Sequence, residues 1–285
     1  MTALRSWPPL VKDVSKNILQ DILETKRKEV EQLRRMCDLE TIKSRAAAAP
    51  RARNFFSAVT GKPRRLLNLI AEVKKASPSA GVIRAEFDPV RIARQYAAAG
   101  ADALSVLTDE PYFQGRLDHL RAVRQAVDLP VLRKDFIIDP YQVYQSRAAG
   151  ADAILLIAAA LPAGVLNDLM ILATELRMTV LVEVHGADEL MLVRSMIGFP
   201  HAAYSLLGIN NRDLSTFKVD LGTTIRLAEM ALEGTPIVSE SGIKTRGDVQ
   251  RLKAAAVKAI LVGEALLRRQ DIAAGIEELL GPVTS

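Results

Sequence analysis

The chain has 285 residues, of which 49% are hydrophobic and 25% are charged, and its formal net charge is +5. This composition is typical of a globular protein that is long enough for one α/β barrel or two smaller domains. The single cysteine, Cys37, excludes an internal disulfide and a metal site made of several cysteines, and it fits a reducing compartment.

The N-terminus and the longest apolar stretch give no sign of export or membrane insertion. The first residues, MTALRSWPPLVK, lack the apolar segment of a signal peptide. The longest apolar run, residues 153–166, contains Pro162 and Gly164 and is too short to span a bilayer. We therefore predict a cytoplasmic protein with no membrane partner.

The excess of positive charge does not indicate a nucleic-acid partner. Basic residues are scattered among acidic ones, as in KRKEVEQLRR (residues 26–35), and aromatic residues do not alternate with them. This pattern predicts a solvated helix face and no nucleic-acid partner. The net charge equally favours an anionic small molecule as the ligand.

The first part of the chain is interpreted as an extension and not as a separate domain. Residues 1–14 predict a loose arm, and the apolar stripe of Ile18–Met36 predicts an amphipathic helix. A second short helix is predicted at 39–48, and the segment RARNFFSAVTGKPRR (51–65) is interpreted as a basic connector. We expect residues 1–66 to form an N-terminal arm and helical extension that packs on the domain that follows.

Strands and helices alternate through residues 67–285. Apolar runs recur at intervals of roughly 23 to 34 residues, and each interval suits one βα unit. We predict a (β/α)8 TIM barrel whose active site lies at the carboxyl ends of the strands. A doubly wound sheet is the alternative; it should show a glycine-rich dinucleotide turn after an early strand, which the sequence lacks. The eight runs are Leu69–Val73, Ala103–Leu107, Pro130–Leu132, Ala153–Ile157, Val180–Val184, Leu206–Ile209, Pro236–Val238 and Ala259–Val262.

Two of the βα units nearly repeat each other and carry signals for helix ends. Residues 87–107 read FDPVRIARQYAAAGADALSVL, and residues 138–157 read IDPYQVYQSRAAGADAILLI. In each, an aspartate precedes a proline at the start of a predicted helix, and a glycine ends that helix before the next strand. Thr245 and Asp248 predict a capping box at the start of a later helix.

The first strand lies in IAEVKKASPS (residues 70–79) and ends in charged residues. Alternate side chains on a strand share a face, so Glu72 and Lys74 are expected on the face of Ile70. A carboxylate and an ammonium on a buried face are costly unless they are paired and used. From this segment alone, an edge strand with a solvated Glu72–Lys74 pair is an equal alternative.

Four later strands also end in polar residues. In a barrel all of these ends meet at one mouth, so the pattern predicts an active site and not a set of structural ion pairs. The residues are Lys134 in VLRKDF, Glu183 in VLVEV, Asn210 and Arg212 in LLGINNRDL, and Glu240 in IVSESG.

Small residues follow the last two strands. Ser241-Gly242 and Gly263-Glu264 resemble the phosphate cradle of such barrels, where backbone N–H groups and a helix N-terminus meet the anion. Ser77, after the first strand, could add a hydroxyl donor. Ordinary turn chemistry is the alternative for each of these features taken alone.

Six phrases carry a family resemblance, namely IAEVKKASPS, SVLTDEPYFQG, LRKDFIID, LLGINNRDL, VSESGI and ILVGEALL. From about Ile18 to the C-terminus, the chain resembles indole-3-glycerol phosphate synthase of tryptophan biosynthesis. The resemblance implies a monofunctional carboxy-lyase that closes the ring of 1-(2-carboxyphenylamino)-1-deoxyribulose 5-phosphate and releases carbon dioxide and water. It implies neither a metal nor an organic cofactor. We expect a small phosphorylated substrate as the partner, and a monomer or weak homodimer.

The resemblance also implies roles for the residues at the mouth. Lys134 protonates the keto oxygen as general acid while the aromatic carbon attacks, and Glu183 assists the later dehydration. Lys74, held by Glu72, contacts the substrate carboxylate and shares the acid work. Arg212 binds that carboxylate, Asn210 fixes polar geometry beside it, and Glu240 orients the catalytic groups. The anthranilate ring is held by Phe113, Phe136 and Leu155. The phosphate is bound by Ser77, Ser241, Gly242, Gly263 and Glu264, the last through its backbone.

Two other functions remain open from the residues alone. One is a Schiff-base lyase or aldolase on the same barrel, with Lys134 as the nucleophile. The other is a catalytically inactive barrel that binds a phosphorylated ligand; intact Lys74, Lys134 and Glu183 argue against it. The histidines, among them His185 and His201, have no metal-ligand spacing, and we expect solvated or capping roles for them.

Overall fold

The structure is a computed structural model that describes residues 18–214 and 216–283, so the predicted arm of residues 1–14 lies outside the described residues. The strands are β1 (Asn68–Val73), β2 (Ala76–Ser77), β3 (Gly81–Val82), β4 (Ala103–Leu107), β5 (Val131–Lys134), β6 (Ala153–Ile157), β7 (Thr179–Val184), β8 (Ser205–Asn210), β9 (Ile237–Glu240) and β10 (Ala259–Val262). The helices are α1 (Ile18–Met36), α2 (Leu39–Ala48), α3 (Phe55–Thr60), α4 (Pro89–Ala98), α5 (Glu110–Phe113), α6 (Leu117–Ala126), α7 (Pro140–Ala148), α8 (Ala163–Glu175), α9 (Ala187–Val193), α10 (Gly222–Met230), α11 (Arg246–Ala254), α12 (Glu264–Leu267) and α13 (Ile272–Leu280), with 3₁₀ turns at Ala158–Ala160 and Ala202–Tyr204.

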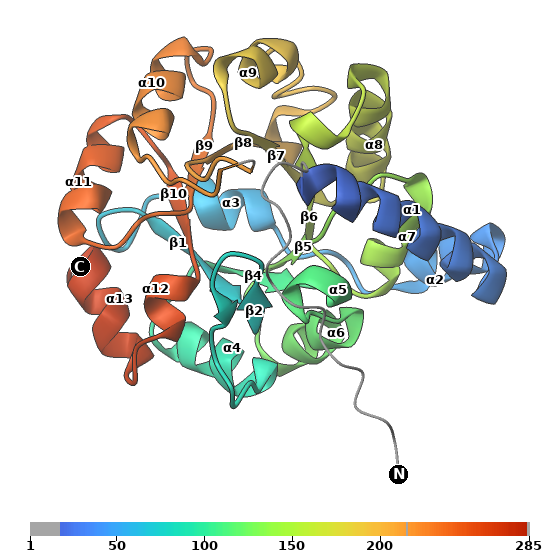
Figure 1. Ribbon diagram of the computed structural model, residues 1–285, viewed down its shortest axis with the longest axis horizontal. Helices are drawn as coiled ribbons and strands as arrows, with labels where there is room; N and C mark the ends of the chain where they lie inside the picture. The colour runs from blue at the N-terminus through green and yellow to red at the C-terminus, as the bar shows by residue number, and fades with distance from the viewer. Residues whose placement is uncertain (1–17, 215, 284–285) are drawn as a thin grey trace.

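Eight strands form a closed parallel barrel in the order β1-β10-β9-β8-β7-β6-β5-β4, and β2 pairs with β3 in a separate hairpin after β1. Figure 1 shows the ring of strands with helices around it and with α1 and α2 at one side. The predicted (β/α)8 barrel with an N-terminal helical extension is confirmed, and the doubly wound sheet is wrong. All eight predicted runs fall on observed strands, although Pro130 and Pro236 lie one residue before β5 and β9.

The alternation predicted for the first strand separates two apolar regions of the barrel. Ile70 packs inside the barrel, whereas Ala71 and Val73 belong to the larger core between the strands and the surrounding helices. All six residues of β1 are buried, which is the pattern of a central parallel strand. The edge-strand alternative for Glu72 and Lys74 is therefore wrong.

The predicted helix caps are confirmed. The side chain of Asp88 accepts from the amides of Val90 and Arg91 at the start of α4, with Pro89 in the first turn. Asp139 and Pro140 play the same parts in α7, and Thr245 with Asp248 forms a capping box on α11. Gly100 and Gly150 follow α4 and α7 with φ of +83° and +90°, a conformation that favours glycine.

The segment that we interpreted as a basic connector contains a helix, α3, so that part of the interpretation is wrong. Phe55 and Val59 on this helix are fully buried and pack on the inward side chain of Ile70. Asn68, the first residue of β1, donates from its side-chain amide to the carbonyls of Val59 and Gly61 at 3.1 and 3.0 Å. Helix α3 therefore closes the barrel at the amino ends of its strands, and in Figure 1 it lies within the ring of strands.

The helices that precede the barrel pack against α7. Tyr141 on α7 donates its hydroxyl to the carbonyls of Leu33 and Cys37, and Arg34 on α1 pairs with Asp139 at 2.8 Å.

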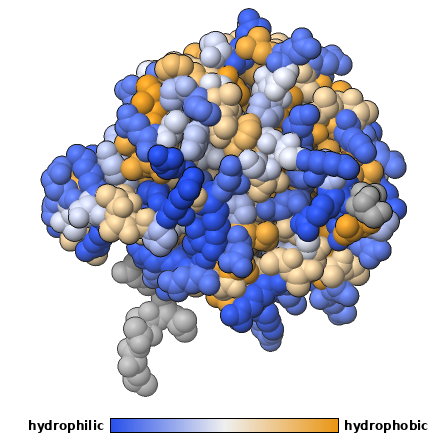
Figure 2. Space-filling model, turned by 180° about the vertical axis from the view of Figure 1, so that it is seen from behind, coloured by the Kyte–Doolittle hydropathy of each residue, from blue (hydrophilic) through white to orange (hydrophobic). Residues whose placement is uncertain are grey.

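On the face seen in Figure 2, hydrophilic and apolar side chains are interspersed. In the described part of the chain, every helix is too short or too polar to cross a membrane.

Candidate active site

A cavity of about 1030 Å³ opens at the carboxyl ends of the barrel strands. It has both charged and apolar walls, and the structure brings together in it every site residue that we predicted from the sequence. These residues are Glu72, Lys74, Ser77, Phe113, Lys134, Phe136, Leu155, Glu183, Asn210, Arg212, Glu240, Ser241, Gly242, Gly263 and Glu264.

Lys134 ends β5 and points into this cavity between two carboxylates. Its Nζ lies 2.8 Å from Oε2 of Glu183 on β7 and 2.5 Å from Oε2 of Glu240 on β9. Burial opposes the charge on Lys134, but the carboxylates of Glu183, Glu240 and Glu72 outweigh it and raise the pKa of the ammonium above its ordinary value. Lys134, whose side chain is 12% exposed, is therefore a largely buried ammonium ion, which can donate a proton but is not a free amine nucleophile.

The two carboxylates differ in their electrostatic surroundings. Burial disfavours the charge on Glu183, but Lys134 and His185 hold the pKa of its carboxyl below the usual range. Burial raises the pKa of Glu240 to about 7, and the charge of Glu183 adds to this while Lys134 opposes it. Of the two carboxylates, Glu240 is thus the one that gains a proton first as the pH falls.

Glu72 and Lys74 form an ion pair at the end of β1, as the sequence predicted. Glu72 packs closely against Gly263 in the loop after β10. A Cβ at this position would clash with the side-chain oxygen of Glu72. In the same way, a Cβ at Gly208 would come within 2.6 Å of Oε1 of Glu240. Both glycines leave room for a buried glutamate, and this close approach explains why no larger residue fits at these positions.

Asn210 is the last residue of β8, and Arg212 follows it by two positions. The Arg212 amide donates to Oδ1 of Asn210 at 3.0 Å, and the Arg212 guanidinium donates to the carbonyl of Phe217 at 3.3 Å. Both residues line the cavity and are partly exposed to it. A guanidinium in such a position can bind a carboxylate through paired N–H groups.

An aromatic wall is formed by Phe113 on α5 and Phe136 after β5. Their ring centroids are 6.1 Å apart and the rings are inclined by 38°. Leu155 on β6 is only 3% exposed and also lines the cavity. These three residues give the site an apolar surface large enough to contact an aromatic ring.

The loops after β9 and β10 also line the cavity. Ser241 and Gly242 both have positive φ, +67° and +78°, which is uncommon for a residue with a side chain. Gly263 precedes α12, and Glu264 turns its carboxylate to Arg268 at 2.9 Å. The Oγ of Ser77 accepts from the Ala80 amide at 3.2 Å within the first loop.

The described residues contain no group of three His, Cys, Asp or Glu side chains placed to hold a metal ion.

Solved structures share the barrel at low sequence identity. A crystal structure of 3-hexulose-6-phosphate synthase aligns with a TM-score of 0.59 at 18% identity, over 75% of this chain and 98% of that one. A thiamine phosphate pyrophosphorylase from Pyrococcus furiosus aligns with a TM-score of 0.53 at 17% identity, over 76% and 95%. At such identities the likeness shows the fold alone.

The family model described as indole-3-glycerol phosphate synthase matches residues 19–279. The chain belongs to the indole-3-glycerol phosphate synthase family. The indole-3-glycerol phosphate synthase of Neisseria gonorrhoeae (strain NCCP11945) is 51% identical, over 92% of this chain and 99% of the relative. That of Geobacillus kaustophilus (strain HTA426) is 49% identical, over 93% and 97%. The family, the lyase activity and the link to tryptophan biosynthesis that we predicted from the sequence are confirmed.

The sequence prediction for one histidine of this chain is wrong. His185 was expected to be solvated or capping, but its Nε2 lies 3.2 Å from Oε1 of Glu183 and its Nδ1 lies 3.2 Å from Oε2 of Glu189. Burial opposes protonation, but the two glutamates raise the pKa of the imidazole to about 10. His185 is therefore an imidazolium that holds Glu183 ionised. His201 does cap a turn, since its Nδ1 accepts from the Ala203 amide.

A second supporting residue, Asn211, was also missed. Its buried amide nitrogen donates to the carbonyls of Glu240 and Ser241 at 2.9 and 3.0 Å, and its oxygen accepts from Thr224. Asn211 thereby ties the loop after β9 to the end of β8. The phrase LLGINNRDL predicted Asn210 for the cavity, but nothing in it indicated that the next residue, Asn211, would bond to groups on later elements of the chain.

Proposed function

We propose that this chain closes the indole ring of 1-(2-carboxyphenylamino)-1-deoxyribulose 5-phosphate with Lys134 as the general acid. The observation that carries the proposal is the buried Lys134 ammonium, held by Glu183 and Glu240 in a cavity with an aromatic wall. When the aromatic carbon attacks the ketone, negative charge develops on the keto oxygen. A fixed ammonium stabilises this charge and then transfers a proton to the oxygen.

The later steps need a base and a second proton donor. Loss of carbon dioxide returns the bonding electrons to the ring, and the new hydroxyl then leaves as water while a proton is removed. Glu183 is suited to assist this dehydration, because the imidazolium of His185 and the ammonium of Lys134 hold it as a carboxylate. Lys74, which follows β1 and is paired with Glu72, shares the role of proton donor. Glu240 orients Lys134.

The remaining residues account for the two anionic ends and the ring of the substrate. Arg212 and Lys74 bind the substrate carboxylate, and Asn210 holds the Arg212 backbone beside it. Phe113, Phe136 and Leu155 hold the anthranilate ring. The phosphate is bound by the loops after β1, β9 and β10, through Ser77, Ser241, Gly242, Gly263 and the backbone of Glu264.

The proposal extends to the setting of the enzyme. The substrate is a small phosphorylated molecule, and we propose neither nucleic acid nor membrane as a partner. The protein acts in the cytoplasm as a monomer or weak homodimer. Residues 1–66 serve as an extension of the catalytic unit formed by residues 67–285, and the contacts of α1 with α7 support the packing of this extension on the barrel.

The direct test is to mix the purified protein with 1-(2-carboxyphenylamino)-1-deoxyribulose 5-phosphate and to follow indole fluorescence. We expect fluorescence to rise with turnover and carbon dioxide to be released in equal amount. The matched control is Lys134→Arg, which keeps the positive charge but donates a proton poorly because guanidinium remains protonated. A Lys134→Arg variant with normal turnover would remove Lys134 from the chemistry.

A further inference from the structure

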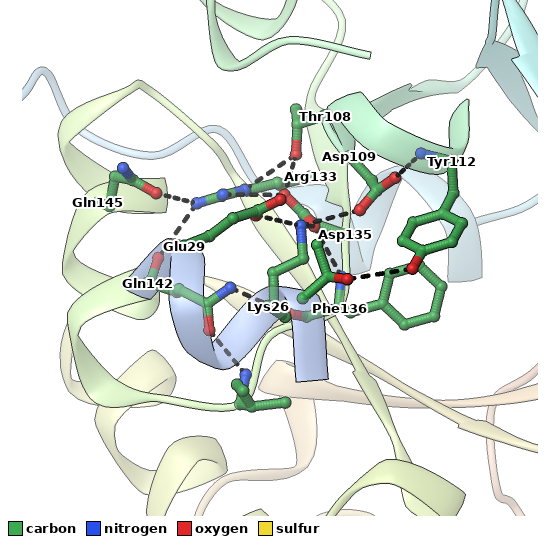
Figure 3. A network of polar contacts seen from close by, with 12 residues as sticks. Lys26, Glu29, Thr108, Asp109, Tyr112, Arg133, Asp135, Phe136, Gln142 and Gln145 are labelled. Carbon is green, nitrogen blue, oxygen red and sulfur yellow. Dashed lines mark hydrogen bonds and ion pairs between the residues drawn. The ribbon is translucent and has the colours of Figure 1, made fainter. Parts of the chain in front are cut away.

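A second buried lysine lies outside the cavity, where helix α1 meets the barrel. The Nζ of Lys26 is 2.7 Å from Oε2 of Glu29, 2.9 Å from Oδ2 of Asp109 and 3.0 Å from Oδ1 of Asp135. Figure 3 shows its side chain pointing from α1 between the two aspartates. We refer to the residues Lys26, Glu29, Thr108, Asp109, Arg133 and Asp135 as the Lys26 cluster.

All of the Lys26 cluster is closed to solvent except Glu29, whose side chain is 31% exposed. Lys26 is 3% exposed, and the side chains of Asp109 and Asp135 are 0% and 2% exposed. Burial opposes the charge on Lys26, but Asp135, Asp109 and Glu29 raise its pKa above the ordinary value. Breaking one of these buried ion pairs would leave an uncompensated charge, which is costly. The contacts therefore resist any separation of α1 from the barrel at this point.

The two aspartates each control a loop that carries one ring of the aromatic wall. Asp109 caps α5 by accepting from the Tyr112 amide at 2.9 Å, and Phe113 is the last residue of that helix. Asp135 accepts from the Phe136 amide at 2.8 Å and directly follows Lys134 in the chain. A single ammonium, on Lys26, therefore joins the segments on which Phe113, Phe136 and the general acid are mounted.

Two further contacts hold the same joint. The guanidinium of Arg133 donates to Oδ2 of Asp135 at 2.9 Å and to Oγ1 of Thr108 at 3.1 Å, so Asp135 is fixed from the barrel side as well. On α1, the hydroxyl of Thr25 lies 3.1 Å from that of Tyr112. Helix α1 also contributes Ile18, Leu19 and Ile22 to the cavity wall.

We propose that Lys26 is a positioning residue for ring closure, which acts by holding Asp109 and Asp135 at a fixed separation and thereby sets the spacing of the aromatic wall beside Lys134. This inference rests on the proposed function of the cavity. Lys26 touches no substrate, and its effect passes through the two loops. The N-terminal helix is in this way a part of the active site and not only a cover for the barrel.

The expected consequence is confined to one end of the substrate. The ring that attacks the ketone must meet it in a near-attack geometry, and a displacement of about 1 Å can cost ~10²-fold in rate. Within residues 18–214 and 216–283, no hydrogen bond or ion pair joins the loops after β9 and β10 to the Lys26 cluster. Loss of Lys26 should therefore impair ring closure while phosphate binding remains.

The test uses the full-length charge-matched variant Lys26→Met/Asp109→Asn, because Lys26→Met alone leaves the buried Asp109 without its ion pair and could fail to fold. The double change removes one positive and one negative charge, and asparagine keeps the helix cap at α5. The control is Arg34→Met on the same helix, which removes an exposed ion pair to Asp139 that joins α1 to α7. Circular dichroism checks that each variant is folded at the assay temperature.

We expect the double variant to lose about 10-fold or more in kcat/KM, with inhibition by inorganic phosphate changed by less than about twofold. Arg34→Met should retain kcat/KM within about twofold. Equal activity in the double variant and in Arg34→Met would overturn the proposal. An equal fold-loss in kcat/KM and in the affinity for inorganic phosphate would also overturn it, because such a result indicates a general structural role. A wild-type protein that does not turn over this substrate would instead contradict the proposed function.

Discussion

The two ends of the same barrel are built in opposite ways. Along β7 the inward residues change from Leu181 to Glu183, and along β9 from Val238 to Glu240, over two residues in each strand. The amino ends are apolar and are closed by α3, whereas the carboxyl ends are ionic and open into the cavity. The apolar end is suited to stability and the ionic end to chemistry, as is usual for this fold.

The comparison also shows what the ionic end costs. Phe55 and its neighbours gain free energy by leaving water, at about 25 cal/mol per Å² of apolar surface. Lys134, Glu183 and Glu240 lose hydration when they are buried, and their mutual attraction only offsets that loss. If this division is correct, substitutions at the two ends should separate stability from turnover.

The largest effect is expected at the ionic end. Glu183→Gln should lower kcat by about 10²- to 10⁴-fold, because a carboxamide cannot exchange a proton. Its unfolding midpoint should change little, since Lys134 keeps its ion pair with Glu240. Steady-state kinetics and thermal unfolding measure the two quantities. A Glu183→Gln enzyme with near-normal kcat would move this residue from chemistry to architecture.

The reverse is expected at the apolar end. Phe55→Ala should lower the free energy of unfolding by about 3–5 kcal/mol, because a buried ring is replaced by a cavity under the barrel. At a temperature where the protein is folded, kcat should stay within about twofold, since the site is at the other end of the strands. Phe56→Ala is the matched control, because Phe56 is only partly buried. Denaturant titration that gives equal losses for both variants would contradict the role of α3.

A smaller effect is expected from pH. Burial raises the pKa of Glu240 to about 7, so the carboxyl gains a proton as the pH falls through that value. Protonation removes one of the charges that orient Lys134, and kcat/KM should fall several-fold between about pH 8 and pH 6. Glu240→Gln is neutral at every pH and should have a lower plateau without this step. A pH profile with the same step in Glu240→Gln would assign it to another group or to the substrate.

The sequence is sufficient to predict the ionic end, because its residues follow apolar strand runs at a regular spacing. The period of the strands alone assigns Glu72, Lys134, Glu183 and Glu240 to one mouth of the barrel. Helix α1 is predicted with the observed bounds, Ile18–Met36, because 19 residues show several turns of apolar periodicity.

The features that the sequence does not reveal depend on contacts made only in the folded chain. Helix α3 has six residues, which is too short for a helical period, and its buried face is only visible once the barrel closes around Phe55. Lys26 lies in a run of charged residues that is typical of a solvated helix face, and its partners Asp109 and Asp135 are 83 and 109 positions away. His185 likewise gains its role only because the fold places a carboxylate on each side of its ring.

The central claim is that Lys134 donates a proton and forms no covalent bond with the substrate. It is tested most directly by incubating the enzyme with substrate and sodium borohydride and then measuring intact mass, with Lys134→Arg as the control. Because Lys134 is held as an ammonium ion by Glu183 and Glu240, the account predicts unmodified protein together with active turnover. A reduced substrate adduct on Lys134, absent from the Lys134→Arg control, would contradict the claim and identify a Schiff-base mechanism.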